Sequence, residues 1–150
     1  LIFDPIKDEM FFAEKGSGAF LNNSRIRVSN KKKLSQSLLV TGGPKFDSKK
    51  KEQIFDEYTK ISKSIDAPIR KFGSAALDMA NVACGRFDGY WQWELNFWDI
   101  AAGLIIVKEA GGYVDFIGND QKSSIKKNIL ATNSIIHKEL DDSLSKKIIE

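Results

Sequence analysis

The stretch from residue 94 to residue 112, ELNFWDIAAGLIIVKEAGG, constrains the fold more than any other part of the chain. Its spacing predicts a helix over residues 98–110 that is apolar on nearly every side, and a helix of that kind is buried. Asp99 is the exception, because it places a carboxylate in the first turn, where an unpaired buried charge is costly. The fold must therefore bury this helix and also compensate the acid at its start.

Strand-like and helix-like segments alternate along the rest of the chain. Apolar runs bounded by turn residues predict strands at residues 1–3, 10–13, 19–21, 37–41, 67–72, 86–95, 113–116 and 128–132. Helical spacing and capping residues predict helices at residues 48–63, from Ser74 to Gly85, and from about Ser134 onward. Elements that interleave in this way indicate one α/β or layered α+β domain with a mixed sheet.

The charge balance argues against a nucleic-acid partner. The net charge is +3, and 19 of the 23 basic residues are Lys while only 4 are Arg. Bidentate recognition of phosphates and bases favours Arg, so a dedicated nucleic-acid binder is not expected. The Lys runs at residues 31–33 and 49–51 are expected to be solvated faces, with a phosphate-attracting patch as the alternative.

The sequence favours a cytoplasmic protein that has no membrane partner. No apolar run approaches the roughly 20 residues that span a bilayer, and the first residues lack the pattern of a signal peptide. The single cysteine, Cys84, cannot form an internal disulfide, which suits a reducing compartment. Cys84 is expected to be a small core or helix-end residue, and His137 a surface residue of the closing helix, so neither suggests a nucleophile or a triad.

Two helix starts that follow strands are candidate ligand sites. Residues 73–75 (Gly-Ser-Ala) and 97–99 (Phe-Trp-Asp) place unpaired N–H groups where an anion or a polyhydroxylated ligand could bind. From the pattern alone, helix capping and tight packing are the favoured interpretation. Asp99 has two interpretations as well. It could stabilise the helix dipole, which contributes typically ~0.3–1 kcal/mol, or it could be a hard oxygen ligand for Mg²⁺.

The segment WDIAAGLIIVKEAGG at residues 98–112 is similar to the carboxy-terminal signature of a known family. Further similar segments follow the family's order: DEMFFAEKGSGAFLNNSRIRVS at residues 8–29, FGSAALDMANVACGRFDGYW at 72–91 and ILATNSIIH at 129–137. Together they resemble the inositol monophosphatase family, the Mg²⁺-dependent, lithium-sensitive phosphatases. The resemblance implies a layered αβαβα sandwich, of which residues 1–150 would supply the carboxy-terminal half.

The resemblance also assigns roles to particular residues. Asp99 stands where the family has a metal-binding aspartate that meets a substrate hydroxyl, which makes it a catalytic residue as well as a substrate contact. Gly73, Ser74 and Ala75 stand where the family contacts the ring hydroxyls of its substrate. Gln92 occupies a neighbouring substrate position that is usually Glu, and it removes a negative charge there while it keeps the ability to donate and accept hydrogen bonds.

Two further departures from the family pattern concern acids. Strand alternation would put Glu94 on the same face as Gln92, as a substitute acid or as an exposed structural residue. The segment DPIKDE at residues 4–9 imitates the start of the family's first metal motif, but Lys7 replaces its second aspartate and the segment lies in a hairpin, so it is rejected as a metal site. One carboxylate cannot hold the two or more Mg²⁺ ions that such catalysis requires, so residues 1–150 are expected to be inactive alone.

The resemblance implies a Mg²⁺-dependent phosphomonoesterase that hydrolyses a small-molecule phosphate ester of a polyol with a metal-activated water. A homodimer is expected. Histidinol phosphate, 3′-phosphoadenosine 5′-phosphate and a sugar bisphosphate are alternative substrates. The alternative from another class is a non-catalytic binding module on the same scaffold.

Overall fold

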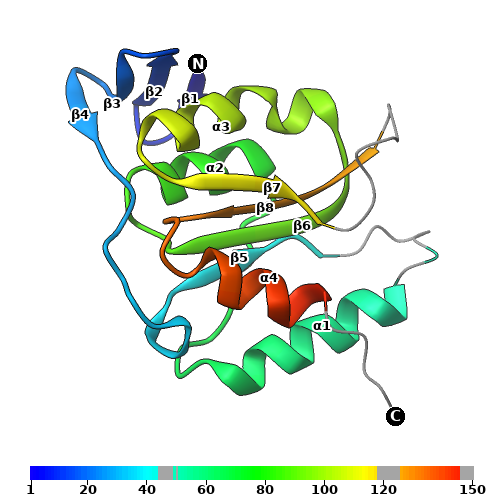
Figure 1. Cartoon of the computed structure of the whole chain (residues 1–150). Helices are drawn as coiled ribbons and strands as arrows, with labels where there is room; N and C mark the ends of the chain where they lie inside the picture. Colours follow the sequence, from blue (N-terminus) through cyan, green and yellow to red (C-terminus); the bar gives the residue numbers. More distant parts are fainter. Residues whose placement is uncertain (44–48, 50, 118–125, 146–150) are drawn as a thin grey trace.

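A computed structural model of the chain describes residues 1–43, 49, 51–117 and 126–145. These residues form two four-stranded sheets. One pair of helices lies between the sheets and a second pair covers the outer face of the second sheet, so the described residues form four layers (Figure 1).

The first sheet is an antiparallel meander in which the strands follow one another in chain order. It contains β1 (Ile2–Asp4), β2 (Glu9–Glu14), β3 (Gly18–Leu21) and β4 (Ser24–Ile26). The predicted hairpin at the start of the chain is confirmed, with Ile2 paired to Phe11. Successive side chains of a strand point to opposite faces, so Phe11 is buried while its neighbour Phe12 is 41% exposed.

The second sheet is mixed, as predicted, and its strand order is β5-β6-β8-β7. It contains β5 (Leu39–Thr41), β6 (Gly89–Asn96), β7 (Tyr113–Phe116) and β8 (Lys126–Thr132). β5 pairs with β6 in parallel, while β8 is antiparallel to both β6 and β7. Because β5 and β6 are parallel, their carboxyl ends lie at the same end of the sheet.

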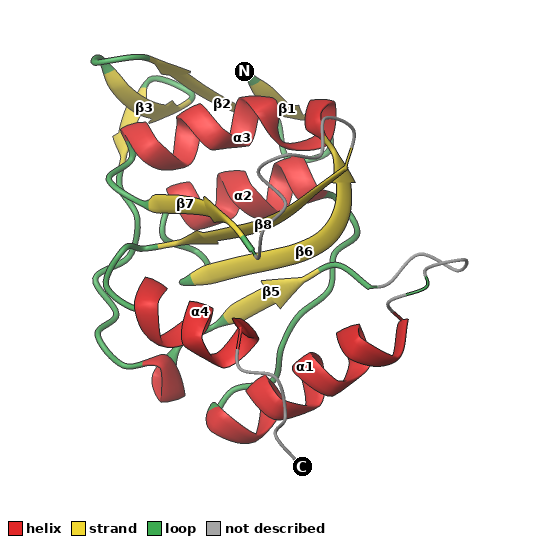
Figure 2. Cartoon of the chain, turned by 45° about the vertical axis from the view of Figure 1, so that its right-hand side comes forward, coloured by secondary structure: helices red, strands yellow, loops and turns green. Residues whose placement is uncertain are grey.

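The helices cover both faces of this second sheet. α2 (Ala75–Ala83) and α3 (Phe97–Glu109) lie between the two sheets, whereas α1 (Lys51–Ser64) and α4 (His137–Ser145) lie on the opposite face (Figure 2). A short 3₁₀ helix (Leu34–Gln36) precedes β5. Within the described residues, no helix combines the length and the apolar character that crossing a bilayer would require.

The prediction that α3 is buried is confirmed for its body. Ile100, Ile106 and Val107 are fully buried in a core shared with α2 and both sheets. The two helices approach closely at Gly103, where an added Cβ would lie 2.7 Å from the sulfur of Met79. The start of the helix differs from the prediction, because Trp98 is 75% exposed and projects away from this core.

The prediction of a strand at residues 67–72 is wrong. Only one isolated bridge forms there, between Val40 and Arg70. Pro68 has no N–H group, so this segment cannot extend a regular hydrogen-bonded ladder. The closing helix also begins later than predicted, at His137, because Ser134 adopts a left-handed conformation with φ of 72°.

Candidate active site

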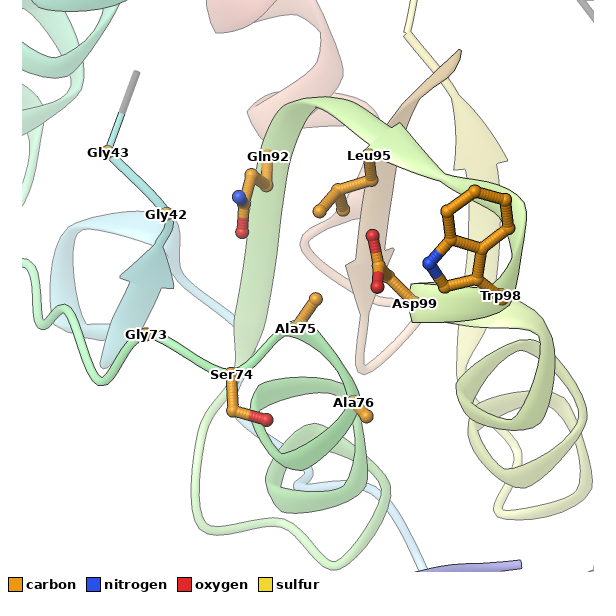
Figure 3. A pocket seen from close by; sticks show the side chains of 10 residues that line it. All are labelled: Gly42, Gly43, Gly73, Ser74, Ala75, Ala76, Gln92, Leu95, Trp98 and Asp99. Atoms are coloured by element: carbon orange, nitrogen blue, oxygen red, sulfur yellow. The ribbon is translucent and has the colours of Figure 1, made fainter. Parts of the chain in front are cut away.

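A cavity of about 660 Å³ opens where β5, β6, α2 and α3 meet (Figure 3). Its lining residues come from four separate segments: Gly42, Gly43, Gly73, Ser74, Ala75, Ala76, Gln92, Leu95, Trp98 and Asp99. The structure thus brings together all five residues that the sequence singled out, Gly73, Ser74, Ala75, Gln92 and Asp99. Their roles in binding and catalysis stay predictions.

The start of α2 forms one wall of the cavity. Ser74 is the N-cap, as predicted, and its hydroxyl oxygen accepts a hydrogen bond from the N–H of Leu77 at 3.4 Å. Gly73 precedes it with φ of 89°, a conformation that favours glycine. Because the first N–H groups of a helix have no intrahelical acceptor, the small residues Ala75 and Ala76 leave polar backbone groups at this wall.

Asp99 lies on the opposite side of the cavity and closes the start of α3. Its Oδ2 atom accepts hydrogen bonds from the backbone N–H of Asn96 at 3.1 Å and from the Asn96 side-chain amide at 3.3 Å. This capping arrangement and the partial exposure of the side chain explain how the helix tolerates the acid. Among the described residues, no group donates a hydrogen bond to Oδ1 of Asp99, so one carboxylate oxygen remains available to a ligand.

Gln92 is held between the backbone of Gly42, directly after β5, and a buried tyrosine. Its Oε1 atom accepts a hydrogen bond from the hydroxyl group of Tyr90 at 2.6 Å. Gly42 packs against the amide so tightly that an added Cβ would lie 2.0 Å from its carbon and oxygen atoms. The sequence analysis missed Gly42, Gly43 and Tyr90, although two successive glycines directly after a buried strand were a visible sign of close approach.

The predicted placement of Glu94 beside Gln92 is wrong. The pairing of β6 with β8 is irregular between Gln92 and Leu95, and Glu94 adopts a left-handed conformation with φ of 57°. A β-bulge adds one residue to a strand and shifts every later side chain to the other face. Leu95 therefore lines the cavity next to Gln92, and Glu94 does not.

Asp78 of α2 and Tyr90 of β6 are buried ionisable residues that are not among the lining residues of the cavity. Burial raises the pKa of the Tyr90 hydroxyl far above its usual range, and the negative charges of Asp78 and Asp99 add to this effect. Asp78 is 1% exposed, and its Oδ2 atom has no hydrogen-bond partner among the described residues. Burial raises the pKa of this carboxyl to about 7. Because its own pKa is raised, the Tyr90 hydroxyl remains a protonated hydrogen-bond donor at neutral pH.

The remaining candidates lie outside the cavity. Cys84 is the C-cap of α2, as predicted, and burial raises the pKa of its thiol. His137 is half-buried rather than at the surface, because its ring packs edge-on against Tyr113 and its Nδ1 atom lies 3.0 Å from the hydroxyl of Thr132. Asp4 accepts hydrogen bonds from backbone N–H groups within its own turn, as expected for a hairpin.

A sequence profile of the inositol monophosphatase family matches residues 1–149. The chain belongs to this family. It is 38% identical over 144 residues to the inositol-1-monophosphatase of Caulobacter vibrioides, covering 95% of this chain and 56% of that protein. It is 47% identical over 122 residues to the Nus factor SuhB of Xylella fastidiosa, covering 80% of this chain and 44% of that protein.

Solved structures of the inositol monophosphatase family share the fold. The extragenic suppressor protein suhB of Bartonella henselae superposes with a TM-score of 0.89 at 42% identity, over 97% of this chain and 55% of that one. The inositol monophosphatase of Anabaena gives 0.83 at 39% identity, over 95% and 56%. The predicted fold class is confirmed. The chain spans about half the length of the relatives that it matches.

Asp99 is the metal ligand that the sequence predicted, and this role stays a prediction. Among the described residues, no three His, Cys, Asp or Glu side chains gather closely enough to hold a metal ion. The free Oδ1 atom of Asp99 is a hard oxygen donor of the kind that Mg²⁺ prefers, so the cavity lining can supply one ligand to such an ion.

Proposed function

We propose that the protein is a Mg²⁺-dependent phosphomonoesterase that hydrolyses a phosphate ester of a polyol. One observation carries the proposal: the cavity combines a carboxylate that has a free oxygen with the start of a helix built from small residues. Membership of the inositol monophosphatase family and relatives named inositol-1-monophosphatase support the same conclusion.

Asp99 would contribute one oxygen ligand to Mg²⁺, and the other ligands would come from outside the described residues. Bound Mg²⁺ would supply an activated water for attack on phosphorus and would stabilise the leaving alkoxide. Asp99 itself is well placed for this role, because the capping hydrogen bonds at Oδ2 fix the carboxylate and orient Oδ1.

The alcohol part of the ester would bind between α2 and β6. Backbone N–H groups at the start of α2 can donate to hydroxyl oxygens, and Gln92 contributes an amide at the far wall. The small residues Gly73, Ala75 and Ala76 leave room for a polyol to approach the backbone closely.

The test is the substitution Asp99→Asn in the full-length protein. The amide oxygen can still accept from the N–H of Asn96, so the fold should be retained. Removing the hydrogen-bond partner of a metal ligand typically lowers metal affinity or activity by about 10–100-fold. Loss of a direct ligand should therefore lower Mg²⁺-dependent phosphate release by more than about 100-fold. The readouts are release of phosphate from myo-inositol 1-phosphate and the thermal unfolding temperature.

Asp142→Asn is the matched control, because Asp142 is an exposed aspartate of α4. It should leave both readouts unchanged. Full activity of Asp99→Asn would overturn the metal assignment of Asp99.

A second candidate function is a partner-binding role that needs no catalysis. The observation that favours it is the name Nus factor SuhB, carried by relatives 47% and 42% identical to this chain. In that case Asp99→Asn would leave the partner-dependent function of the protein intact, whereas a function that depends on catalysis would be lost together with phosphate release. The same variant therefore separates the two candidates.

We further propose a cytoplasmic homodimer that acts on a small-molecule phosphate ester and has no nucleic-acid or membrane partner. Light scattering after size-exclusion chromatography tests the homodimer. Rates on histidinol phosphate, 3′-phosphoadenosine 5′-phosphate and a sugar bisphosphate, compared with myo-inositol 1-phosphate, test the substrate class.

A further inference from the structure

We propose that Tyr90 is a positioning residue that turns the side-chain NH₂ group of Gln92 toward the cavity, so that the site favours an ester whose alcohol part carries a carboxylate there. The inference rests on the proposed function and adds a specificity to it. It concerns the wall of the cavity that Gly42, Gly43 and Gln92 form.

The orientation of the amide follows from the buried hydroxyl of Tyr90. This side chain is fully buried, and a buried hydroxyl proton without an acceptor is costly. Among the described residues, Oε1 of Gln92 is the acceptor that the hydroxyl reaches, at 2.6 Å, and the nearby Asp78 Oδ2 has no partner at all. If the amide were reversed, the tyrosine hydroxyl would face an N–H donor and would lose this acceptor.

The oxygen of Gln92 is therefore occupied, and its nitrogen is not. Among the described residues, no hydrogen bond from Nε2 of Gln92 is formed. Figure 3 shows the Gln92 amide facing Gly42, and an added Cβ at Gly42 would lie 2.5 Å from Nε2 and 2.0 Å from Oε1. The group that this wall offers to a ligand is thus a pair of N–H donors.

The charges around the cavity permit an anion at this wall. The β-bulge removes Glu94 from the lining, so Asp99 is the one carboxylate among the described lining residues. Leu95 lies between Asp99 and Gln92 (Figure 3). The partial positive charge at the start of α2 also favours a negative group nearby. A Glu at position 92 would repel a carboxylate, whereas a fixed amide N–H pair binds it.

The experiment compares two esters that differ at one carbon, glucose 1-phosphate and glucuronate 1-phosphate, with the full-length protein and Mg²⁺. The measured quantity is the ratio of kcat/KM for the acid to kcat/KM for the neutral ester. The wild type should favour the acid. Gln92→Glu should lower the ratio by at least about tenfold, since it replaces a donor with a repelling charge.

Tyr90→Phe separates positioning from a merely structural role. It removes the hydroxyl that fixes the amide, so the amide can present its oxygen, and the ratio should fall by about three- to tenfold. Tyr113→Phe is the matched control, because Tyr113 is 51% exposed and lies outside the cavity lining. It should leave the ratio unchanged.

The specificity fails if Gln92→Glu changes the ratio by less than about twofold, or if the wild type favours the neutral ester. The role of Tyr90 fails if Tyr90→Phe behaves like Tyr113→Phe. Absence of Mg²⁺-dependent hydrolysis of these two esters and of myo-inositol 1-phosphate would instead refute the proposed function. Calorimetric titration of glucuronate 1-phosphate and glucose 1-phosphate into wild type and Gln92→Glu then decides the specificity by affinity alone.

Discussion

Asp78 shows how a single residue can make stability depend on pH. Asp78 belongs to α2, and 1% of its surface is exposed. Burial raises its pKa from 3.8 to about 7, because the charged form is poorly solvated there. Between these two pH values the folded state binds more protons than the unfolded state. The free energy of unfolding therefore falls as the pH rises through this range.

The substitution Asp78→Asn should remove this penalty. We expect its unfolding temperature to exceed that of the wild type at about pH 8, because the wild type then holds a buried charge. The gain should shrink as the pH falls from 7 and disappear below about pH 4, where the carboxyl is protonated in both states. Thermal unfolding at intervals across this range measures the effect. A lower unfolding temperature for Asp78→Asn at about pH 8 would contradict it.

At the scale of secondary-structure elements, the contact between α2 and α3 positions both helix starts at the cavity. Gly103 of α3 allows this approach, since a Cβ there would lie 2.7 Å from Sδ and 2.9 Å from Cβ of Met79. The side-chain sulfur can move, but the Cβ atom of Met79 is fixed by its backbone. Any larger residue at position 103 must therefore push the helices apart.

Gly103→Val should destabilise the protein by about 1–3 kcal/mol, the usual cost of overpacking a core. Lys108→Val is the control, because Lys108 is an exposed residue of the same helix and reports the helix propensity of valine alone. Urea unfolding of both variants measures the difference. Equal free energies of unfolding for the two variants would show that the helices have room to spare at Gly103.

At the scale of the whole molecule, Glu109 links the first sheet to the last turn of α3 through hydrogen bonds. Its two carboxylate oxygens accept hydrogen bonds from the N–H groups of Gly16 and Gly18, each at 2.9 Å. Arg27 donates a further hydrogen bond to the backbone carbonyl of Glu109 at 3.1 Å. The bonds from Gly16 and Gly18 lower the pKa of the Glu109 carboxyl, because they favour its charged form.

Glu109→Gln should loosen the loop between β2 and β3, since one amide oxygen cannot accept both N–H groups in the same way. The pKa of this Glu is lowered on folding, so its contribution is complete above the ordinary value of 4.5 and is lost at lower pH. We expect faster hydrogen exchange at Gly16 and Gly18 and a lower unfolding temperature near neutral pH. Both differences from the wild type should vanish in acid. Glu52→Gln, at an exposed glutamate of α1, is the control. Unchanged hydrogen exchange at Gly16 and Gly18 would show that Glu109 does not hold the loop between β2 and β3.

Much of the fold and site followed from local sequence patterns. The apolar period around Asp99 predicted α3 and its burial, and Ser74 before an apolar run predicted the start of α2. Both features are encoded within one or two helical turns, so neighbouring residues are sufficient to predict them. The family resemblance then named five residues that the structure places around one cavity.

The sequence by itself therefore determined the family, the main elements and the acid at the start of α3. The tertiary structure alone decided how β6 continues past Gln92, that Gly42 packs against that side chain, and that Tyr90 donates to it. It also decided that Pro68 leaves residues 67–72 outside the sheet and that His137 is half-buried. The physical reason is common to these cases. A bulge, a close approach and a buried hydrogen bond depend on which distant segments are neighbours in space, and the periodicity of one segment carries no information about its partners.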